Sequence, residues 1–142
     1  MICEDPVMEQ EMELRPRRVR QRVLIVDDDK TMAEILALAL NNQGYVALKA
    51  NSGREAVEIA RREKPHLILM DIGLPDIDGL TVSQQLCDGY DTGNIPIIVV
   101  SGNDSEDIVR ECRSVGCRYF LRKPYDPNAL LLLVQASLAD EF

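Results

Sequence analysis

The chain has 142 residues, 46% hydrophobic and 28% charged, which predicts a single soluble globular domain with a true core. Its longest apolar runs, such as IPIIVV and ALLLLV, are six residues each, far short of the roughly 18 that a membrane-spanning helix needs. The net charge of −8 disfavours a nucleic acid backbone as direct partner, because phosphate binding needs clustered cations.

The first 22 residues carry their charge in two blocks. Five acids between residues 4 and 13 precede five arginines between residues 15 and 22, so the whole net charge resides in residues 23–142. We assign residues 1–21 to a charged N-terminal extension that is solvated, or whose run RPRRVRQR docks on a partner or on the acidic body of the protein. The acidic start lacks the features of a secretory signal, so we expect a cytoplasmic location.

Five short runs have the composition of buried strands. Each is rich in aliphatic or aromatic residues and is bounded by turn-forming or polar residues. The runs are VLIVD (23–27), YVALKA (45–50), LILMD (67–71), PIIVVS (96–101) and YFLR (119–122).

Helical patterns lie between these runs and after the last one. Met32, Ile35, Leu36 and Ala39 repeat with helical spacing, and Gly44 is placed to end this first helix. Helix caps and breakers delimit the others. The second lies between its cap Ser52 and Pro65, the third spans Leu80 to Leu86, the fourth runs from Asp104 or Ser105 to Ser114, and the fifth opens with Asp126 and Pro127 and runs to Leu138.

Strict alternation of strand and helix predicts an α/β fold with a parallel sheet and right-handed crossovers. We predict a single doubly wound, flavodoxin-like sheet of five strands in the order 2-1-3-4-5, with five helices. The strand order is taken from the fold class, since periodicity alone does not give it. In such sheets ligands bind at the carboxyl ends of the strands, beside the first and third.

Acidic residues end two strands that would be neighbours in this order. Asp27, Asp28 and Asp29 follow the first strand, and Asp71 ends the third. Two carboxylates about 4 Å apart repel by about 4 kcal/mol at an effective dielectric near 20, so a divalent cation would relieve the site. Magnesium suits best, because it takes a few oxygen ligands and keeps waters that phosphoryl oxygens can replace. Asp29 is better explained as the cap of the first helix.

A hydroxyl and an ammonium complete the predicted edge. Ser101 ends the fourth strand, and Lys123 follows the fifth. Alone, a turn serine or a surface lysine would be unremarkable. Together with the acids they supply a hydrogen-bond donor and a positive charge to an anion, which indicates that an aspartate accepts a phosphoryl group here.

The blocks VLIVDDD, LILMDIGLPDIDGL, PIIVVSG and YFLRKPY resemble those of receiver domains in two-component response regulators, over residues 22–140. The resemblance implies a CheY-like fold with Asp71 as phosphoacceptor. It also implies that Asp27, Asp28 and Asp71 bind Mg²⁺ together with the backbone carbonyl of Gly73.

The same resemblance assigns the remaining site residues. Ser101 takes the hydroxyl role and Lys123 contacts the phosphate, with a cis bond to Pro124. Ser101 and Phe120 form the switch. Serine stands where threonine is frequent, and Phe120 lacks the hydroxyl of the tyrosine often found there.

The resemblance further implies partners for the protein. The phosphoryl donor is expected to be a sensor histidine kinase or a histidine phosphotransfer protein. The fourth helix, fifth strand and fifth helix are expected to act on a downstream protein target or effector domain, or to form a homodimer. The leucine run 130–133 covers more than one helix face, so some of these side chains are expected to contact a partner or a second copy. The chain ends soon after this helix, so we expect a stand-alone relay or part of a longer regulator.

Three other functions are compatible with parts of this pattern. An aspartyl phosphatase that uses magnesium needs a second aspartate two residues after the first, where this chain has Gly73. A nucleotide-driven switch would need a phosphate-binding loop that is missing from the sequence. A phosphorylation-independent binding module of the same fold stays open as an alternative. Both this module and the receiver are signalling proteins, so we do not expect an enzyme.

The cysteines do not predict a metal site. Cys3, Cys87, Cys112 and Cys117 contain no C-x-x-C pair, so we expect reduced thiols and no zinc.

Overall fold

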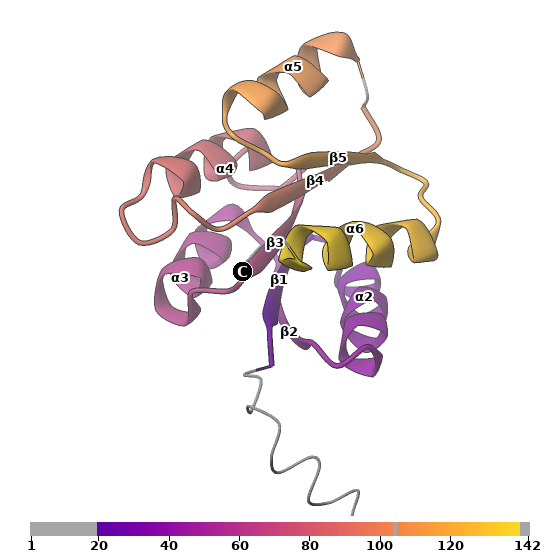
Figure 1. Ribbon diagram of the computed structural model, residues 1–142. Coiled ribbons are helices and arrows are strands. Elements are labelled where there is room, and N and C mark those ends of the chain that lie inside the picture. The colour runs from indigo at the N-terminus through magenta and orange to yellow at the C-terminus, as the bar shows by residue number, and fades with distance from the viewer. Residues whose placement is uncertain (1–19, 104, 140–142) are drawn as a thin grey trace, which may run out of the picture.

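The computed structural model describes residues 20–103 and 105–139 (Figure 1). Most of the predicted N-terminal extension and Asp104 therefore lie outside the described residues. The strands are β1 (Arg22–Val26), β2 (Val46–Ala50), β3 (Leu67–Asp71), β4 (Ile97–Ser101) and β5 (Tyr119–Arg122). The helices are α2 (Lys30–Asn42), α3 (Gly53–Glu63), α4 (Gly79–Asp88), α5 (Glu106–Ser114) and α6 (Pro127–Ala139).

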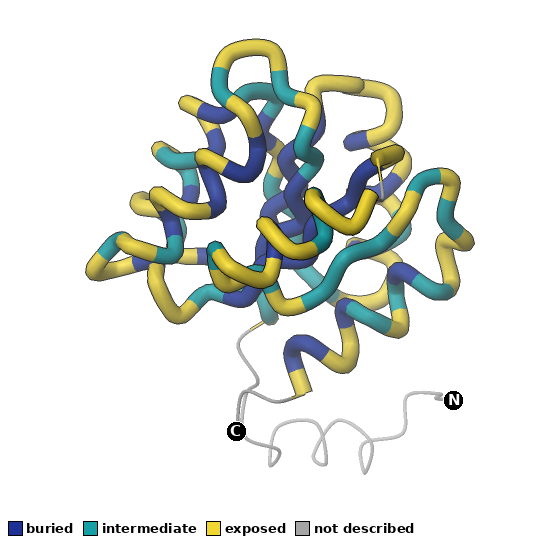
Figure 2. Tube along the Cα trace, turned by 90° about the horizontal axis from the view of Figure 1, so that it is seen from above, coloured by how far each residue is buried: buried dark blue, intermediate teal, exposed yellow. Residues whose placement is uncertain are grey.

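All five strands pair in parallel in the order β2-β1-β3-β4-β5, which confirms the predicted fold class. Helices α2 and α6 cover one face of the sheet, and α3, α4 and α5 cover the other (Figure 1). The strands are buried along the centre of the molecule while the helices alternate between buried and exposed positions (Figure 2). No helix of the described part of the chain is long and apolar enough to cross a bilayer.

Side chains of each central strand divide between two hydrophobic cores. In β3, Leu67 and Leu69 pack toward α2 and α6, whereas Ile68 and Met70 pack toward the other three helices. Successive residues of a strand point to opposite faces, so a strand covered on both sides must be apolar at every position. This arrangement explains the continuous run that precedes Asp71.

Helix caps lie where the sequence predicts them. The Asp29 carboxylate accepts hydrogen bonds from the Thr31 and Met32 N–H groups at the start of α2. Serines cap two other helices in the same way, Ser52 at α3 and Ser105 at α5. Gly44 follows α2 with a φ of 95°, a conformation that glycine adopts without strain.

The buried face of α2 differs from the stripe that the sequence indicates. Leu36 is buried, but Met32 and Ile35 are 36% and 55% exposed. The helix instead buries the stripe Ala33, Leu36, Ala37 and Leu40 against the sheet. Both stripes have helical spacing in a segment this rich in apolar residues, so periodicity could not choose between them.

Most leucines of the run 130–133 in α6 pack in or against the core. Leu130 is buried, and Leu131 and Leu133 pack against the core that α2 and α6 share. Leu132 is 64% exposed, so it is the leucine of this run that a partner could contact.

Replacing Gly79 with alanine should destabilise the fold. A Cβ atom on Gly79 would lie 2.4 Å from the backbone oxygen of Asp71, so the start of α4 would have to move away from the end of β3. We expect Gly79→Ala to lower the free energy of unfolding by about 1–3 kcal/mol, measured by urea denaturation followed by circular dichroism. The matched control is Gly102→Ala, where a Cβ meets no atom within 4 Å and the change should stay within about 0.5 kcal/mol. Equal losses in the two variants would contradict this packing argument.

Candidate functional site

Three carboxylates meet at the carboxyl edge of the sheet. Asp27 follows β1, Asp28 comes next, and Asp71 ends β3. The pairing of β1 with β3 aligns Val26 with Met70, which places the residues that follow side by side. One carboxylate oxygen from each acid lies within 4.8 Å of the others, so the structure brings the predicted acids together.

The acids differ in their exposure to solvent. Asp27 is 5% exposed, Asp71 is half-buried and Asp28 is exposed. Burial raises the pKa of Asp27, and the negative charge of Asp71 raises it further. The Asp29 N–H, which donates to Asp27 Oδ1 at 2.9 Å, and the Lys123 ammonium lower that pKa but do not cancel the effect. Burial, more than the charge of Asp71, is therefore what makes the ionised form of Asp27 costly.

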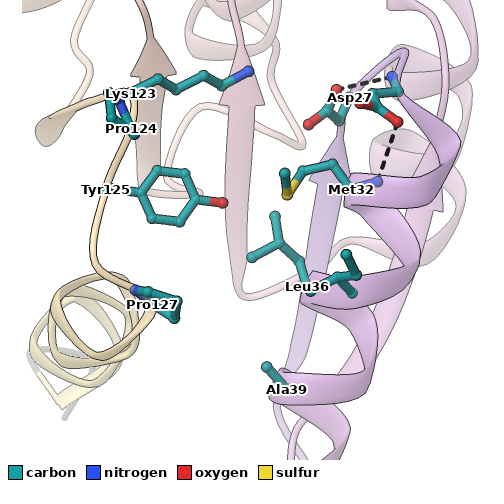
Figure 3. Close-up of a pocket in the computed structure, with 10 residues that line it drawn as sticks. Asp27, Met32, Leu36, Ala39, Lys123, Pro124, Tyr125 and Pro127 are labelled. Carbon is teal, nitrogen blue, oxygen red and sulfur yellow. Dashed lines mark hydrogen bonds between the residues drawn. The ribbon is translucent and has the colours of Figure 1, made fainter.

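Lys123 supplies the positive charge of the site. Its Nζ lies 3.3 Å from Asp71 Oδ2, and its side chain extends from the end of β5 across the sheet edge toward Asp27 (Figure 3). The Lys123 N–H donates to the Ser101 carbonyl at 2.8 Å, which extends the pairing of β4 with β5 by one residue. The bond between Lys123 and Pro124 is cis, as expected.

The second oxygen of Asp71 also has a partner. Asp71 Oδ1 accepts a hydrogen bond from the Gly73 N–H at 3.1 Å. Both carboxylate oxygens of Asp71 thus face donors, Lys123 on one side and the Gly73 backbone on the other, so the carboxylate is held in one orientation. Gly73 is exposed in this loop, and the ligand role of its carbonyl stays a prediction.

Ser101 and Phe120 lie on neighbouring strands. Ser101 is buried at the end of β4, and its Oγ accepts from the Asn103 N–H at 3.0 Å. Phe120 pairs in register with Val99 and packs with it into the core beneath α3, α4 and α5. Strand alternation puts Ser101 on the same face as Val99, and so on the side of the sheet that Phe120 occupies. Their switch roles stay predictions.

The nearby loop acids Asp76 and Asp78 bind backbone groups of helices. Asp76 accepts hydrogen bonds from the Gly53 and Arg54 N–H groups at the start of α3, at 2.8 and 3.1 Å. The Gly53 hydrogen bond is the main reason that the pKa of Asp76 is lowered. Asp78 caps α4 by accepting from the Leu80 N–H. Neither acid is placed as the second aspartate that a phosphatase of this kind needs.

Sequence reasoning did not single out two further residues at this edge. The Asn51 side chain donates to the Asp27 carbonyl at 3.1 Å and so links the end of β2 to the acid-bearing loop. Burial raises the pKa of the Tyr125 hydroxyl, and the charges of Asp27 and Asp71 raise it further. Tyr125 belongs to the block YFLRKPY, but its place beside the acids depends on the direction the chain takes after Pro124.

The donor set fits a small hard cation. Carboxylate oxygens are the ligands that Mg²⁺ takes in proteins, and it leaves some positions to water. Within residues 20–103 and 105–139, Asp27, Asp28 and Asp71 form the one group of three or more acidic, histidine or cysteine side chains close enough to hold a metal ion. Their unbalanced charge is a further reason to expect a cation there.

The described cysteines are free thiols. Cys112 is buried, and Cys87 and Cys117 are partly buried. Burial raises the pKa of Cys117 to about 12, so this thiol stays protonated at neutral pH. These three residues therefore agree with the predicted reduced state, while Cys3 lies outside the described residues.

Comparisons with known proteins identify relatives of the whole domain. The sequence matches the response regulator receiver domain over residues 23–135. It is 39% identical over 118 residues to protein PilH of Pseudomonas aeruginosa, covering 83% of this chain and 98% of PilH. It is 34% identical over 121 residues to the DNA-binding response regulator MtrA of Mycobacterium tuberculosis, covering 84% of this chain but only about half (51%) of MtrA.

The structure also matches that of a solved response regulator receiver domain protein. The crystal structure of a CheY-like response regulator receiver domain protein from Methanospirillum hungatei matches with a TM-score of 0.82 at 26% identity. The match covers 86% of this chain and 96% of that chain. Both the sequence and the arrangement of strands and helices therefore point to the same family.

Neutralising Asp27 should stabilise the protein when no divalent cation is present. The raised pKa of Asp27 means that the folded state binds more protons than the unfolded state above pH 3.8, so stability falls as the pH rises through this window. In EDTA at pH 7, we expect Asp27→Asn to raise the free energy of unfolding by about 1 kcal/mol, measured in urea, and to lose this advantage near pH 4.

Magnesium should make the wild type more stable than Asp27→Asn, the reverse of their order in EDTA. At 10 mM MgCl₂ the wild type should gain stability by mass action, and Asp27→Asn should gain much less. Asp29→Asn is the matched control, because asparagine caps helices as well as aspartate does. Equal responses of Asp27→Asn and wild type to the ion would show that Asp27 is not a ligand.

Proposed function

The chain belongs to the response regulator receiver domain family, and we propose that it accepts a phosphoryl group on Asp71 in a Mg²⁺-dependent reaction and passes the signal to a partner protein. Response regulators of this kind are mainly signalling proteins of two-component systems. We propose a cytoplasmic location, where a sensor histidine kinase or a histidine phosphotransfer protein would supply the phosphoryl group. We expect this domain not to bind nucleic acid directly.

The observation that carries the proposal is the surroundings of Asp71. Its carboxylate ends a buried strand, lies close to the carboxylates of Asp27 and Asp28, and contacts Lys123 Nζ at 3.3 Å. A nucleophile, a set of oxygen ligands and a fixed cation thus meet at one edge of the sheet. This combination suits the transfer of an anionic group to a carboxylate.

In the proposed reaction, Asp71 attacks the phosphorus of a phosphohistidine in line with the leaving nitrogen. The phosphorus–nitrogen bond breaks, a phosphorus–oxygen bond to Asp71 forms, and the imidazole leaves with the electron pair of the broken bond. Lys123 would exchange its contact with Asp71 for one with a phosphoryl oxygen. A bound magnesium ion supplies the remaining positive charge that the transferred group needs.

The proposed switch follows from the charge added at Asp71. A phosphoryl group brings about −1.5 to −2 charges and three strong acceptors, so the Ser101 hydroxyl would turn to donate to it. The Asn103 N–H would then lose the acceptor that Ser101 Oγ provides at 3.0 Å, and the loop before α5 would rearrange. Phe120, on the same face of the sheet, would turn into the space that Ser101 leaves.

The proposed output surface is formed by α5, β5 and α6. It lies next to the loop that Ser101 controls and to the strand that carries Phe120. Its partner would be a downstream protein target, an effector domain or a second copy of the chain. A shift from 1:99 to 99:1 requires about 5.5 kcal/mol of differential binding, so we expect phosphorylation alone to shift the equilibrium only partly.

Incubation with acetyl phosphate and MgCl₂ should add one phosphoryl group to the protein. Intact mass spectrometry should detect one adduct per chain, and EDTA should prevent it, because the acids at this site need a counter-ion. Asp71→Ala should abolish the adduct. Asp88→Ala is the matched control, since this acid is exposed at the C-terminal end of α4.

The other outcomes identify the rival functions. Steady release of inorganic phosphate with many turnovers per chain would indicate a phosphatase. No adduct under any of these conditions would indicate a binding module that works without phosphorylation. An adduct that persists in Asp71→Ala would place the acceptor elsewhere.

Loss of the Lys123 charge should slow phosphorylation without removing the acceptor. In Lys123→Gln the side chain stays polar but is one atom shorter, and the positive charge 3.3 Å from Asp71 Oδ2 is lost. We expect adduct formation to slow by about tenfold or more, measured from the time course of the intact mass. Lys30→Gln is the control, because Lys30 is an exposed residue at the start of α2. Equal rates in all three proteins would remove Lys123 from the reaction.

A further inference from the structure

Three thiols lie around the C-terminal end of α5. Cys112 is buried in the last turn of this helix, Cys117 follows the helix, and Cys87 lies near the end of α4. All three pack in or against the core that α3, α4 and α5 share. The proposed phosphoryl chemistry makes no use of them.

The turn that ends α5 brings Cys112 and Cys117 together. The Cys117 N–H donates to the Cys112 carbonyl at 2.9 Å, and the Gly116 N–H donates to the Arg113 carbonyl at 3.1 Å. Gly116 has a φ of 97°, in the left-handed region that glycine adopts without strain. Together these features define a Schellman motif, in which the side chains at the positions of Cys112 and Cys117 often contact each other.

The backbone hydrogen bond also limits the distance between the two Cα atoms. Its length of 2.9 Å, with the covalent bonds that lead from the nitrogen and the oxygen to each Cα atom, allows at most about 7 Å. Disulfides usually join Cα atoms that are about 4.4–6.8 Å apart. The pKa of Cys117 is raised first by burial and next by the Cys112 thiol, which agrees with such a close approach.

The Ser83 hydroxyl lies beside the same pair. Its Oγ is fully buried in α4 and has no hydrogen-bond partner of normal geometry among the described residues. It is nevertheless close enough to the Cys117 sulfur to lower the pKa of that thiol. A hydroxyl donor stabilises a thiolate more than a thiol, so Ser83 favours Cys117 as the sulfur that reacts first.

We propose that Cys112 and Cys117 form a reversible disulfide, which fixes the end of α5 to the segment that leads into β5. The oxidant is a small disulfide of the glutathione class. Neither the disulfide nor its test rests on the proposed function.

The reaction takes place in two exchange steps. The Cys117 thiolate attacks one sulfur of the oxidant, and the other sulfur leaves as a thiolate that takes up the proton lost by Cys117. The Cys112 thiolate then attacks the Cys117 sulfur of the mixed disulfide, and the second small thiolate leaves with the proton of Cys112. The two cysteines lose two electrons, and the oxidant is reduced to two thiols. Cys117 is partly exposed and Cys112 is buried, which sets this order.

Burial makes the disulfide slow to form without opposing it at equilibrium. The pKa of Cys117 is about 12, so its thiolate is rare at neutral pH and its attack on the oxidant is slow. A stabilised thiolate makes a disulfide easy to reduce, but here burial outweighs the effect of Ser83. We therefore expect the pair to respond to sustained oxidising conditions and not to brief ones.

Cys87 is the competing partner for Cys117. Its Sγ lies 3.3 Å from the position that a Cβ on Gly116 would take, so it lies next to the same turn. Cys87 belongs to α4, however, and its position relative to Cys117 depends on packing between separate elements. The Schellman motif holds Cys112 and Cys117 together within one turn, which favours their pairing.

Peptide mapping of the oxidised full chain identifies the pair directly. Trypsin cuts after Arg110, Arg113 and Arg118, so Cys112 and Cys117 fall in two short peptides, ECR and SVGCR. The protein is incubated overnight at about pH 8 with about 1 mM each of reduced and oxidised glutathione, and free thiols are then blocked with iodoacetamide. We expect most chains to give the two peptides joined by a disulfide, and dithiothreitol to separate them.

Two serine variants and one cysteine variant complete the test. Ser83→Ala should slow disulfide formation by about threefold or more, because the Cys117 thiolate loses a donor. Ser137→Ala is the matched control, since this serine is also buried without a hydrogen-bond partner among the described residues but lies in α6. Cys87→Ser should keep the linked peptides. Unchanged circular dichroism spectra would show that the variants fold.

Hydrogen exchange tests whether the disulfide fixes the turn. The amide protons of Gly116 and Cys117 donate the two hydrogen bonds of the motif. Their exchange should slow by about tenfold or more on oxidation and recover after reduction, because opening of the turn is restricted. Equal exchange in the two forms would contradict this part of the proposal.

The proposal is overturned if the wild type keeps free thiols under these conditions, or if Cys117 is joined to Cys87 and not to Cys112. Disulfide-linked dimers in place of the joined peptides would also overturn it. Equal rates for Ser83→Ala and Ser137→Ala would overturn the role of Ser83. The readout does not involve phosphorylation, so failure of the acetyl phosphate reaction would leave the disulfide result intact, and the reverse also holds.

Discussion

Three carboxylates held together at one sheet edge, one of them buried, are the constraint on which the chemistry of this site depends. Pairing of β1 with β3 holds Asp27 and Asp71 side by side, and Asp28 adds a third carboxylate within 4.8 Å. Burial makes the charge on Asp27 harder to accommodate, as the direction of its pKa shift shows. Lys123 and the backbone N–H groups offset part of this charge. What remains favours a cation and, with it, an incoming anionic group.

The scaffold can hold such a site because its stability comes from elsewhere. The central strands bury apolar side chains on both faces, and two separate cores join them to the helices. Close contact between Gly79 and the backbone of Asp71 fixes the end of β3 against α4. The Asp76 hydrogen bonds to α3 anchor the loop after the acceptor. The strands and helices that position the acids are therefore stabilised by apolar packing and backbone contacts, and this stability offsets the repulsion between the like charges.

Much of this site could be predicted from the sequence, because strands and caps depend on local chemistry. An uninterrupted apolar run that ends in Asp71 identifies a strand and its carboxyl end, and Asp29 and Ser52 are the caps they were predicted to be. Long-range geometry could not be predicted in the same way. Which of its two apolar stripes α2 buries depended on how the helix packs on the sheet, and the contact of Asn51 with the Asp27 loop depended on the pairing of β1 with β2.

A crystal structure grown in magnesium chloride tests the central claim most directly. The account predicts one ion at the sheet edge, with carboxylate oxygens of Asp27, Asp28 or Asp71 about 2.0–2.1 Å from it and water in some of the remaining positions. The account is contradicted if these carboxylates lie far apart, or if they meet without an ion at a concentration that saturates ordinary magnesium sites.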